Sequence, residues 1–75
     1  MPRGIRVRHD LEAMIELVIR ERKIALPTTR LAWYARWFGI PVSEQHVANV
    51  CNQMWKEGKL KKIKDGRWTY WKNRR

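Results

Sequence analysis

Leu31-Ala32-Trp33-Tyr34-Ala35-Arg36-Trp37-Phe38-Gly39-Ile40-Pro41-Val42-Ser43-Glu44-Gln45-His46-Val47 is the stretch that decides the fold of this chain. Its first half has apolar residues at helical spacing, and Gly39 stands where a helix end often takes the left-handed conformation. Ser43 is a good N-cap for a following helix. The stretch therefore predicts helices over residues 29–38 and 44–57, joined by a turn over residues 40–42.

The predicted helix over residues 44–57 has one apolar and one polar face. The apolar residues have the spacing of one buried helical stripe: Val47, Val50, Cys51, Met54 and Trp55. The polar residues form the outward face: Gln45, His46, Asn49, Asn52, Gln53 and Lys56. Asn and Gln make paired contacts with adenine, and Lys reaches guanine or phosphate. A solvated helix usually interleaves Glu with Lys, whereas here the acids stand only at the two ends. We therefore expect this face to read bases, the alternative being a merely polar surface.

Beyond Gly58 the apolar period changes from helical to alternating. Runs over residues 60–64 and 67–72 flank Asp65-Gly66, a strong signal for a β-hairpin with a two-residue turn. A turn at Asp65-Gly66 predicts three cross-strand pairs: Ile63 with Trp68, Lys61 with Tyr70, and Leu60 with Trp71.

The predicted hairpin is strongly basic, and Asp65 is its only acid. Its cations are Lys59, Lys61, Lys62, Lys64, Arg67 and Lys72. Such a density of like charge is costly unless phosphates neutralise it, so we expect these cations, with Thr29 and Arg30, to contact a nucleic-acid backbone. Of Trp68, Tyr70 and Trp71, at least two are expected to pack against the helices, while one ring could stack on a base or ribose.

Upstream of the quoted stretch, the sequence predicts one more helix, over residues 11–23, with Asp10 as its N-cap. Its inward residues are Leu11, Met14, Ile15 and Val18. A short extended piece over residues 24–26 ends at Pro27, after which Thr28 or Thr29 is expected to cap the next helix. Residues 1–9 are predicted to form a basic arm that contacts nucleic acid through Arg3, Arg6 and Arg8, and residues 73–75 a basic tail.

The order helix, short strand, helix, turn, helix and hairpin resembles the winged helix-turn-helix superfamily. The resemblance rests on Ala35 four residues before Gly39, on Ile40 after it, on the inward Val47, and on residues 55–60, which resemble the segment leading into the wing. It covers residues 10–72. It implies a mainly α fold, a three-helix bundle with a small β-hairpin as its wing, whose third helix enters a groove while the wing touches the backbone.

The overall composition agrees with a nucleic-acid partner. Seventeen Lys and Arg stand against seven Asp and Glu, which gives a formal net charge of +10. A field of that sign attracts polyanions. The single cysteine, Cys51, excludes an intrachain disulfide and is expected to be a buried core residue, so a reducing, cytoplasmic location on the nucleoid or the ribosome is expected.

Several other classes of function lack support in the sequence. His9, His46 and Cys51 do not have metal-ligand spacing, and neither a phosphate-binding glycine loop nor a nucleophile–base pair is present. The apolar stretches are interrupted by charge within a few residues. We therefore expect no metal, cofactor, small-molecule ligand or membrane partner, and no enzymatic activity.

Two functional hypotheses remain, besides a minor third. The first is a DNA-binding protein, a transcriptional regulator or chromatin-associated factor, which the amide-rich helix favours. The alternative is a structural ribosomal-RNA-binding protein of the small ribosomal type, which the basic termini favour. The third is a winged helix that binds other proteins, against which the net charge argues. Trp33 and Trp37 are expected at the core rim or in a dimer contact, so a homodimer stays open.

Overall fold

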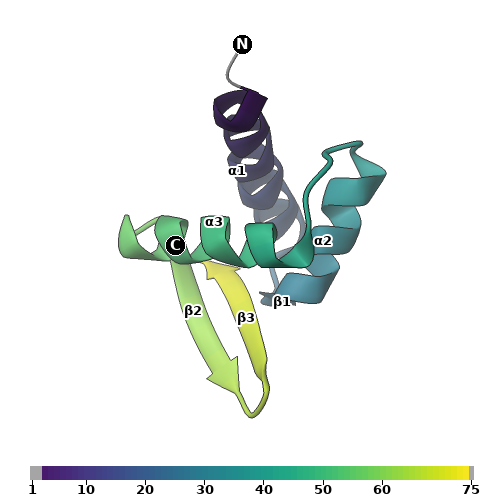
Figure 1. The fold of residues 1–75 in the computed structure, drawn as a ribbon. Helices are drawn as coiled ribbons and strands as arrows, with labels where there is room; N and C mark the ends of the chain where they lie inside the picture. The colour runs from purple at the N-terminus through teal and green to yellow at the C-terminus, as the bar shows by residue number, and fades with distance from the viewer. Residues whose placement is uncertain (1–2, 75) are drawn as a thin grey trace.

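The structure is a computed structural model that describes residues 3–74, with the side chains of residues 8–74. In this part of the chain, three helices and a small three-stranded antiparallel sheet pack together (Figure 1). The elements follow in this order: α1 (Arg3–Arg22), β1 (Leu26–Pro27), α2 (Thr28–Trp37), α3 (Glu44–Lys56), β2 (Leu60–Asp65) and β3 (Trp68–Asn73). In Figure 1, α3 crosses in front of α1, and the β2–β3 hairpin extends below it.

Helix α1 is longer than the sequence predicted. It begins at Arg3, so residues 3–9 are helical rather than a separate arm, and Asp10 lies inside the helix instead of capping it. A contact that crosses the predicted boundary favours this continuation, because Arg8 pairs with Glu12 one turn further on. The predicted inward residues of this helix are buried, and Ile19 joins them.

Helix α2 begins at Thr28, and the predicted threonine cap is wrong. The N-cap position is Pro27, without a side-chain hydrogen bond to the helix. The Thr28 hydroxyl instead accepts a hydrogen bond of 2.9 Å from the indole nitrogen of Trp71 on β3. The helix ends as predicted at Gly39, whose φ of 76° is left-handed. The amides of Gly39 and Ile40 donate to the carbonyls of Arg36 and Ala35, the Schellman pattern that satisfies a helix C-terminus.

The predicted bounds and N-cap of helix α3 are confirmed. The Ser43 hydroxyl accepts a hydrogen bond from the His46 amide, and Gly58, with a φ of 80°, follows the C-cap. Four residues of the predicted stripe are buried: Val47, Val50, Cys51 and Met54. Trp55, the fifth, is 43% exposed, because it stands at the edge of the stripe.

The strand order is β1-β3-β2, and the hairpin register differs from the predicted one. Ile63 pairs with Tyr70, Lys61 with Lys72, and Leu60 with Asn73. The turn residues are Gly66 and Arg67, and only Gly66 has a positive φ, of 61°. Glycine therefore occupies the first central position of the turn, as in a type II′ turn, and not the second position as predicted. The shift moves each partner by two residues, so every side chain keeps its predicted face of the sheet.

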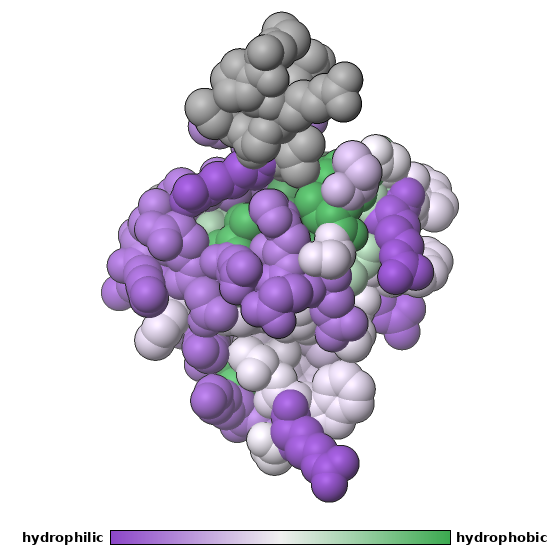
Figure 2. Space-filling view, in the orientation of Figure 1, coloured by the Kyte–Doolittle hydropathy of each residue, from purple (hydrophilic) through white to green (hydrophobic). Residues whose placement is uncertain are grey.

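One apolar core joins all the elements. The largest fully buried side chain is Trp71, and Leu26, Leu31 and Leu60 complete the contact between the sheet and the helices. Within residues 3–74, no helix has the length and apolar character needed to cross a membrane. Figure 2 shows hydrophilic residues over most of the face that carries α3, and a mixture of hydrophilic residues and residues of intermediate hydropathy on the hairpin below it.

Candidate nucleic-acid interface

The outward face of α3 presents a pair of exposed amides. Burial of Val47, Val50 and Cys51 turns Gln45 and Asn49 to the surface, where the Gln45 amide nitrogen donates a hydrogen bond of 3.1 Å to the Asn49 side-chain oxygen. Each amide keeps further donor and acceptor capacity, because one hydrogen bond does not saturate an Asn or Gln side chain. This pair is pre-oriented, and it is available to a partner.

The other predicted face residues of α3 differ in their availability. Lys56 is exposed in the last turn, and Gln53 is exposed but donates to the Glu57 carboxylate at 3.4 Å. Asn52 is half-buried, and its oxygen accepts a hydrogen bond from Lys62. His46 is also half-buried, and its ring Nε2 is buried without a hydrogen-bond partner among the described residues. His46 therefore does not lie fully outward as predicted. The accessible strip consists of Gln45, Asn49, Gln53 and Lys56.

Lys62 connects the hairpin to α3. Its ammonium group donates to the Asn52 oxygen at 3.0 Å and lies 4.8 Å from the ring centre of Trp55 and 5.7 Å from that of Trp71. A cation over aromatic rings is attracted to their faces, and a partly desolvated position strengthens that attraction. Trp55, which is not part of the core, thus makes a cation–π contact with Lys62. Among the predicted phosphate contacts, Lys62 has an internal structural role instead.

A closed cluster of two cations and two acids joins α1 to the end of α3. The Arg8 guanidinium lies 3.8 Å from Glu12 and 3.9 Å from Glu57, and the Lys59 ammonium lies 3.9 Å from Glu12 and 3.5 Å from Glu57. Each cation has two acidic neighbours, so the cluster is neutral overall. Arg8 and Lys59, both predicted to contact phosphate, are therefore already compensated; the side chains of Arg3 and Arg6 lie outside the described residues.

The hairpin has two chemically different faces. Strand alternation and the register place Leu60, Lys62 and Trp71 on one face, which we call the inner face because it packs on the helices. On the other, outer face, Lys61 lies directly opposite Lys72, and Ile63 opposite Tyr70. Like charges directly opposite each other destabilise a sheet. Within the described chain neither lysine of this pair has an ion-pair partner, so the outer face favours an anion between them.

The first turn of α2 borders the outward strip of α3. A groove of about 360 Å³ lies between α2, α3 and the start of β3. Its lining includes Thr29, Gln45, Arg67 and Trp68, and one acid, Glu44. Because Pro27 supplies no cap and Thr28 bonds to Trp71, the first amides of α2 have no side-chain cap. Such a helix end favours a phosphate group. Thr29, Arg30, Lys64 and Arg67, all predicted backbone contacts, are exposed around this region.

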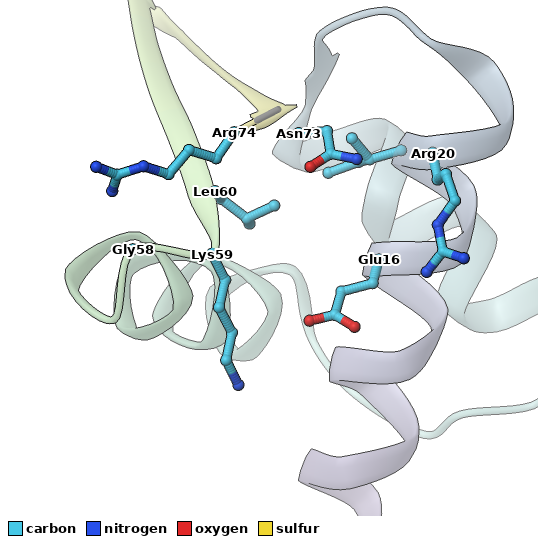
Figure 3. A pocket seen from close by; sticks show the side chains of 8 residues that line it. Glu16, Arg20, Gly58, Lys59, Leu60, Asn73 and Arg74 are labelled. Atoms are coloured by element: carbon cyan, nitrogen blue, oxygen red, sulfur yellow. The ribbon is translucent and has the colours of Figure 1, made fainter.

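A larger hollow lies elsewhere, between α1 and the base of the hairpin (Figure 3). It encloses about 950 Å³, and its charged lining residues are Glu16, Arg20, Lys59 and Arg74. The guanidinium groups of Arg20 and Arg74 point away from each other in Figure 3, while the Glu16 carboxylate faces into the space. The cations do not converge on one point, so this hollow lacks the geometry of a phosphate site.

Two observations bear on metal binding and on the cysteine. Residues 3–74 hold no group of three or more His, Cys, Asp or Glu side chains placed to share a metal ion. Cys51 is buried as predicted, and this burial raises the pKa of its thiol from 9.0 to about 12. A thiol with so high a pKa is almost entirely protonated at neutral pH and is a poor nucleophile.

Comparison of the chain with protein families, curated proteins and solved structures gives no match. The candidate interface is therefore described from the positions of its own residues alone. Sequence reasoning missed that Trp33 and Trp68 border one groove, described below, because their separation in sequence gives no local signal. It also missed the neutral cluster, although Glu12 four residues after Arg8 was a visible signal of pairing.

Proposed function

We propose that this chain is a winged helix-turn-helix protein that binds duplex DNA, with α3 in the major groove and the β2–β3 hairpin as a wing on the backbone. Three helices with a three-stranded antiparallel sheet in the order β1-β3-β2 are compatible with that architecture. A recognition helix of this kind meets base edges with its N-terminal residues. Gln45 and Asn49 occupy that part of α3.

The observation that carries the proposal is the division among the cations. Arg8 and Lys59 are neutralised by acids, and Lys62 is held by Asn52 and two indole rings. The remaining cations predicted to contact the backbone have no ion pair among the described side chains: Arg30, Lys61, Lys64, Arg67 and Lys72. The same holds for Lys56, predicted on the outward face of α3. These unpaired cations come from α2, from the last turn of α3 and from the hairpin. Positive charge that the fold leaves uncompensated is what a phosphate backbone neutralises.

The structural RNA-binding hypothesis depended on basic termini. Arg8, the member of the predicted arm whose side chain is described, pairs with Glu12 and Glu57. This pairing reduces the support for an arm that threads through RNA, whereas the exposed amide pair of α3 supports base recognition in a duplex. We therefore propose DNA over RNA.

The test is the substitution Asn49→Ala, measured on two DNA duplexes. On a duplex selected from a random pool, the variant is expected to lose about 1–3 kcal/mol of binding free energy, because Asn49 makes base contacts there. On a random-sequence duplex the loss is expected to be much smaller. Fluorescence anisotropy at fixed salt measures both affinities.

The matched control is Leu17→Ala, an alanine substitution at an exposed position of α1 that does not line the groove beside α3. It is expected to leave both affinities unchanged, and circular dichroism checks that both variants fold. An equal loss on both duplexes after Asn49→Ala would reject base reading by α3. Tighter binding to structured RNA than to any duplex would transfer the function to the RNA-binding alternative.

A further inference from the structure

Two exposed tryptophans border a second groove, beside the one at the start of α3. Its floor is the outer side of the sheet, where Pro27 pairs with Tyr70 and Trp68 lies two residues before Tyr70. Its wall is the beginning of α2, with Thr29, Arg30 and Trp33. The groove encloses about 370 Å³, within the range of about 300–1,000 Å³ typical of small-molecule sites.

Both indole rings line the groove and are half exposed. Trp33 is 50% exposed and Trp68 is 53% exposed, so neither is used in the core. The ring contact of Trp33 is an edge contact with Tyr34, at 5.1 Å between centres. In the described part of the chain no ring contact joins Trp33 to Trp68. Exposed aromatic surface of this kind, gathered around a hollow, indicates a binding site.

The charges around the groove select the kind of ligand. The Arg30 guanidinium lies 5.9 Å from the ring centre of Trp33. Arg67 directly precedes Trp68, and one acid, Asp65, pairs with Trp68 across the hairpin. The lining contains no acid. A second copy of this chain, with its net charge of +10, would therefore add like charge, whereas a group attached to phosphate would be attracted.

The position of the groove next to α3 indicates which phosphate-linked group would reach it. Thr29 and Trp68 line both this groove and the neighbouring one, which also contains Gln45 of the proposed recognition helix. A nucleic acid that lies on α3 would therefore pass the entrance of the tryptophan groove. Nucleobases stack on aromatic rings without a strong preference for sequence, because every base has a π-face.

We propose that the groove between α2 and β3 binds one unpaired nucleobase, stacked on Trp68, from the nucleic acid that α3 contacts. The inference rests on the proposed function and extends it from regular duplexes to duplexes with a bulged or flipped base. A base inside the stack is not accessible to such a groove, so a bulge, a nick or an end supplies the ligand.

The experiment compares two DNA duplexes that differ at a single bulge. One has a bulged thymine, and the other has an abasic residue at the same position, so backbone and charge are the same. The protein is expected to bind the thymine bulge about 5- to 150-fold more tightly, the gain expected from stacking one base. Trp68→Ala is expected to remove this preference, and Trp68→Phe to retain part of it.

The matched control is Trp37→Ala, because Trp37 is 71% exposed but does not line the groove. It is expected to keep the full preference. Equal affinity for the two bulges, or a preference that survives Trp68→Ala, would overturn the inference while regular duplex binding still supports the proposed function. Absence of binding to any of these duplexes would overturn both.

Discussion

Each face of the β2–β3 hairpin carries a tryptophan and a lysine, but these residues are buried and paired on one face and exposed on the other. On the inner face, Trp71 is 1% exposed and hydrogen-bonded, and Lys62 is held by Asn52. On the outer face, Trp68 lies half exposed, and Lys61 faces Lys72. Where it packs on the helices, the inner face thus satisfies its own chemistry, and only Lys64, near the turn, remains exposed there. The outer face leaves both aromatic surface and positive charge unsatisfied. This difference teaches that a count of lysines and tryptophans cannot separate structural residues from binding residues.

The largest expected contrast is between the two tryptophans. Trp71→Ala is expected to lower the free energy of unfolding by about 3–5 kcal/mol, because it leaves a large cavity and removes the hydrogen bond to Thr28. Trp68→Ala is expected to change it by less than about 0.5 kcal/mol, as at other exposed positions. Urea unfolding followed by circular dichroism measures both. Similar losses in the two variants would mean that the hairpin faces are not divided in this way.

Helix α3 also has a buried face and an exposed face, and substitutions of Cys51 test the buried one. Cys51→Ser is expected to cost about 1–3 kcal/mol, because it places a hydroxyl in the core without a hydrogen bond. In the native protein, thiol reagents are expected to label Cys51 only as fast as the chain unfolds. Fast labelling in buffer, compared with labelling in denaturant, would contradict the inward orientation of this stripe.

The raised pKa of Cys51 also predicts a pH dependence. Folding favours the protonated thiol, so the stability from this group is complete below pH 9.0 and is lost as the pH rises toward about 12. Cys51→Ala is therefore expected to make the decline in unfolding free energy over this range less steep than in the parent chain. Unfolding measured at several alkaline pH values gives the comparison.

How well the sequence predicted each element depended on how local the determinant is. The bounds of α3 could be read from Ser43 and Gly58, because a cap and a left-handed glycine act within one turn. The start of α1 could not, since it depends partly on the contact of Arg8 with Glu57, far along the chain. The hairpin register was predicted incorrectly, because the turn is centred on Gly66-Arg67 and not on Asp65-Gly66. Both a type I′ turn with glycine second and a type II′ turn with glycine first fit the Asp65-Gly66 sequence.

The candidate site followed the same rule. The exposure of Gln45 and Asn49 could be predicted, because helical periodicity alone places them opposite the buried stripe. The internal roles of Lys62 and Lys59 could not, since their partners belong to other elements. From the sequence, every hairpin lysine looked equally free.

Lys61 and Lys62 test the division between the two hairpin faces through an intermediate change in the free energy of unfolding. Lys62→Ala is expected to lower the free energy of unfolding by about 1–2 kcal/mol, because Asn52 and two rings lose their cation. Lys62→Met, which keeps an apolar stem, is expected to recover part of that loss. Lys61→Ala is the matched control on the outer face, and a loss as large as that of Lys62→Ala would contradict the assignment of Lys62 as the structural cation.

The smallest expected effect is on the salt dependence of DNA binding, and it distinguishes charge that binds phosphate from charge that holds the fold. With about five to eight phosphates neutralised, the log–log slope of affinity against salt is expected to be about −5 to −7. Each phosphate-binding lysine contributes about 0.9 to that slope, so the double substitution Lys61→Ala/Lys72→Ala is expected to flatten it by about 2. The same change removes two like charges that face each other, so the fold is expected to become slightly more stable. Lys62→Met is expected to leave the slope unchanged, because its charge is directed to Asn52 and the indole rings. If Lys62→Met flattens the slope as much per charge as the outer pair does, Lys62 binds phosphate too, and its assignment as a structural cation fails.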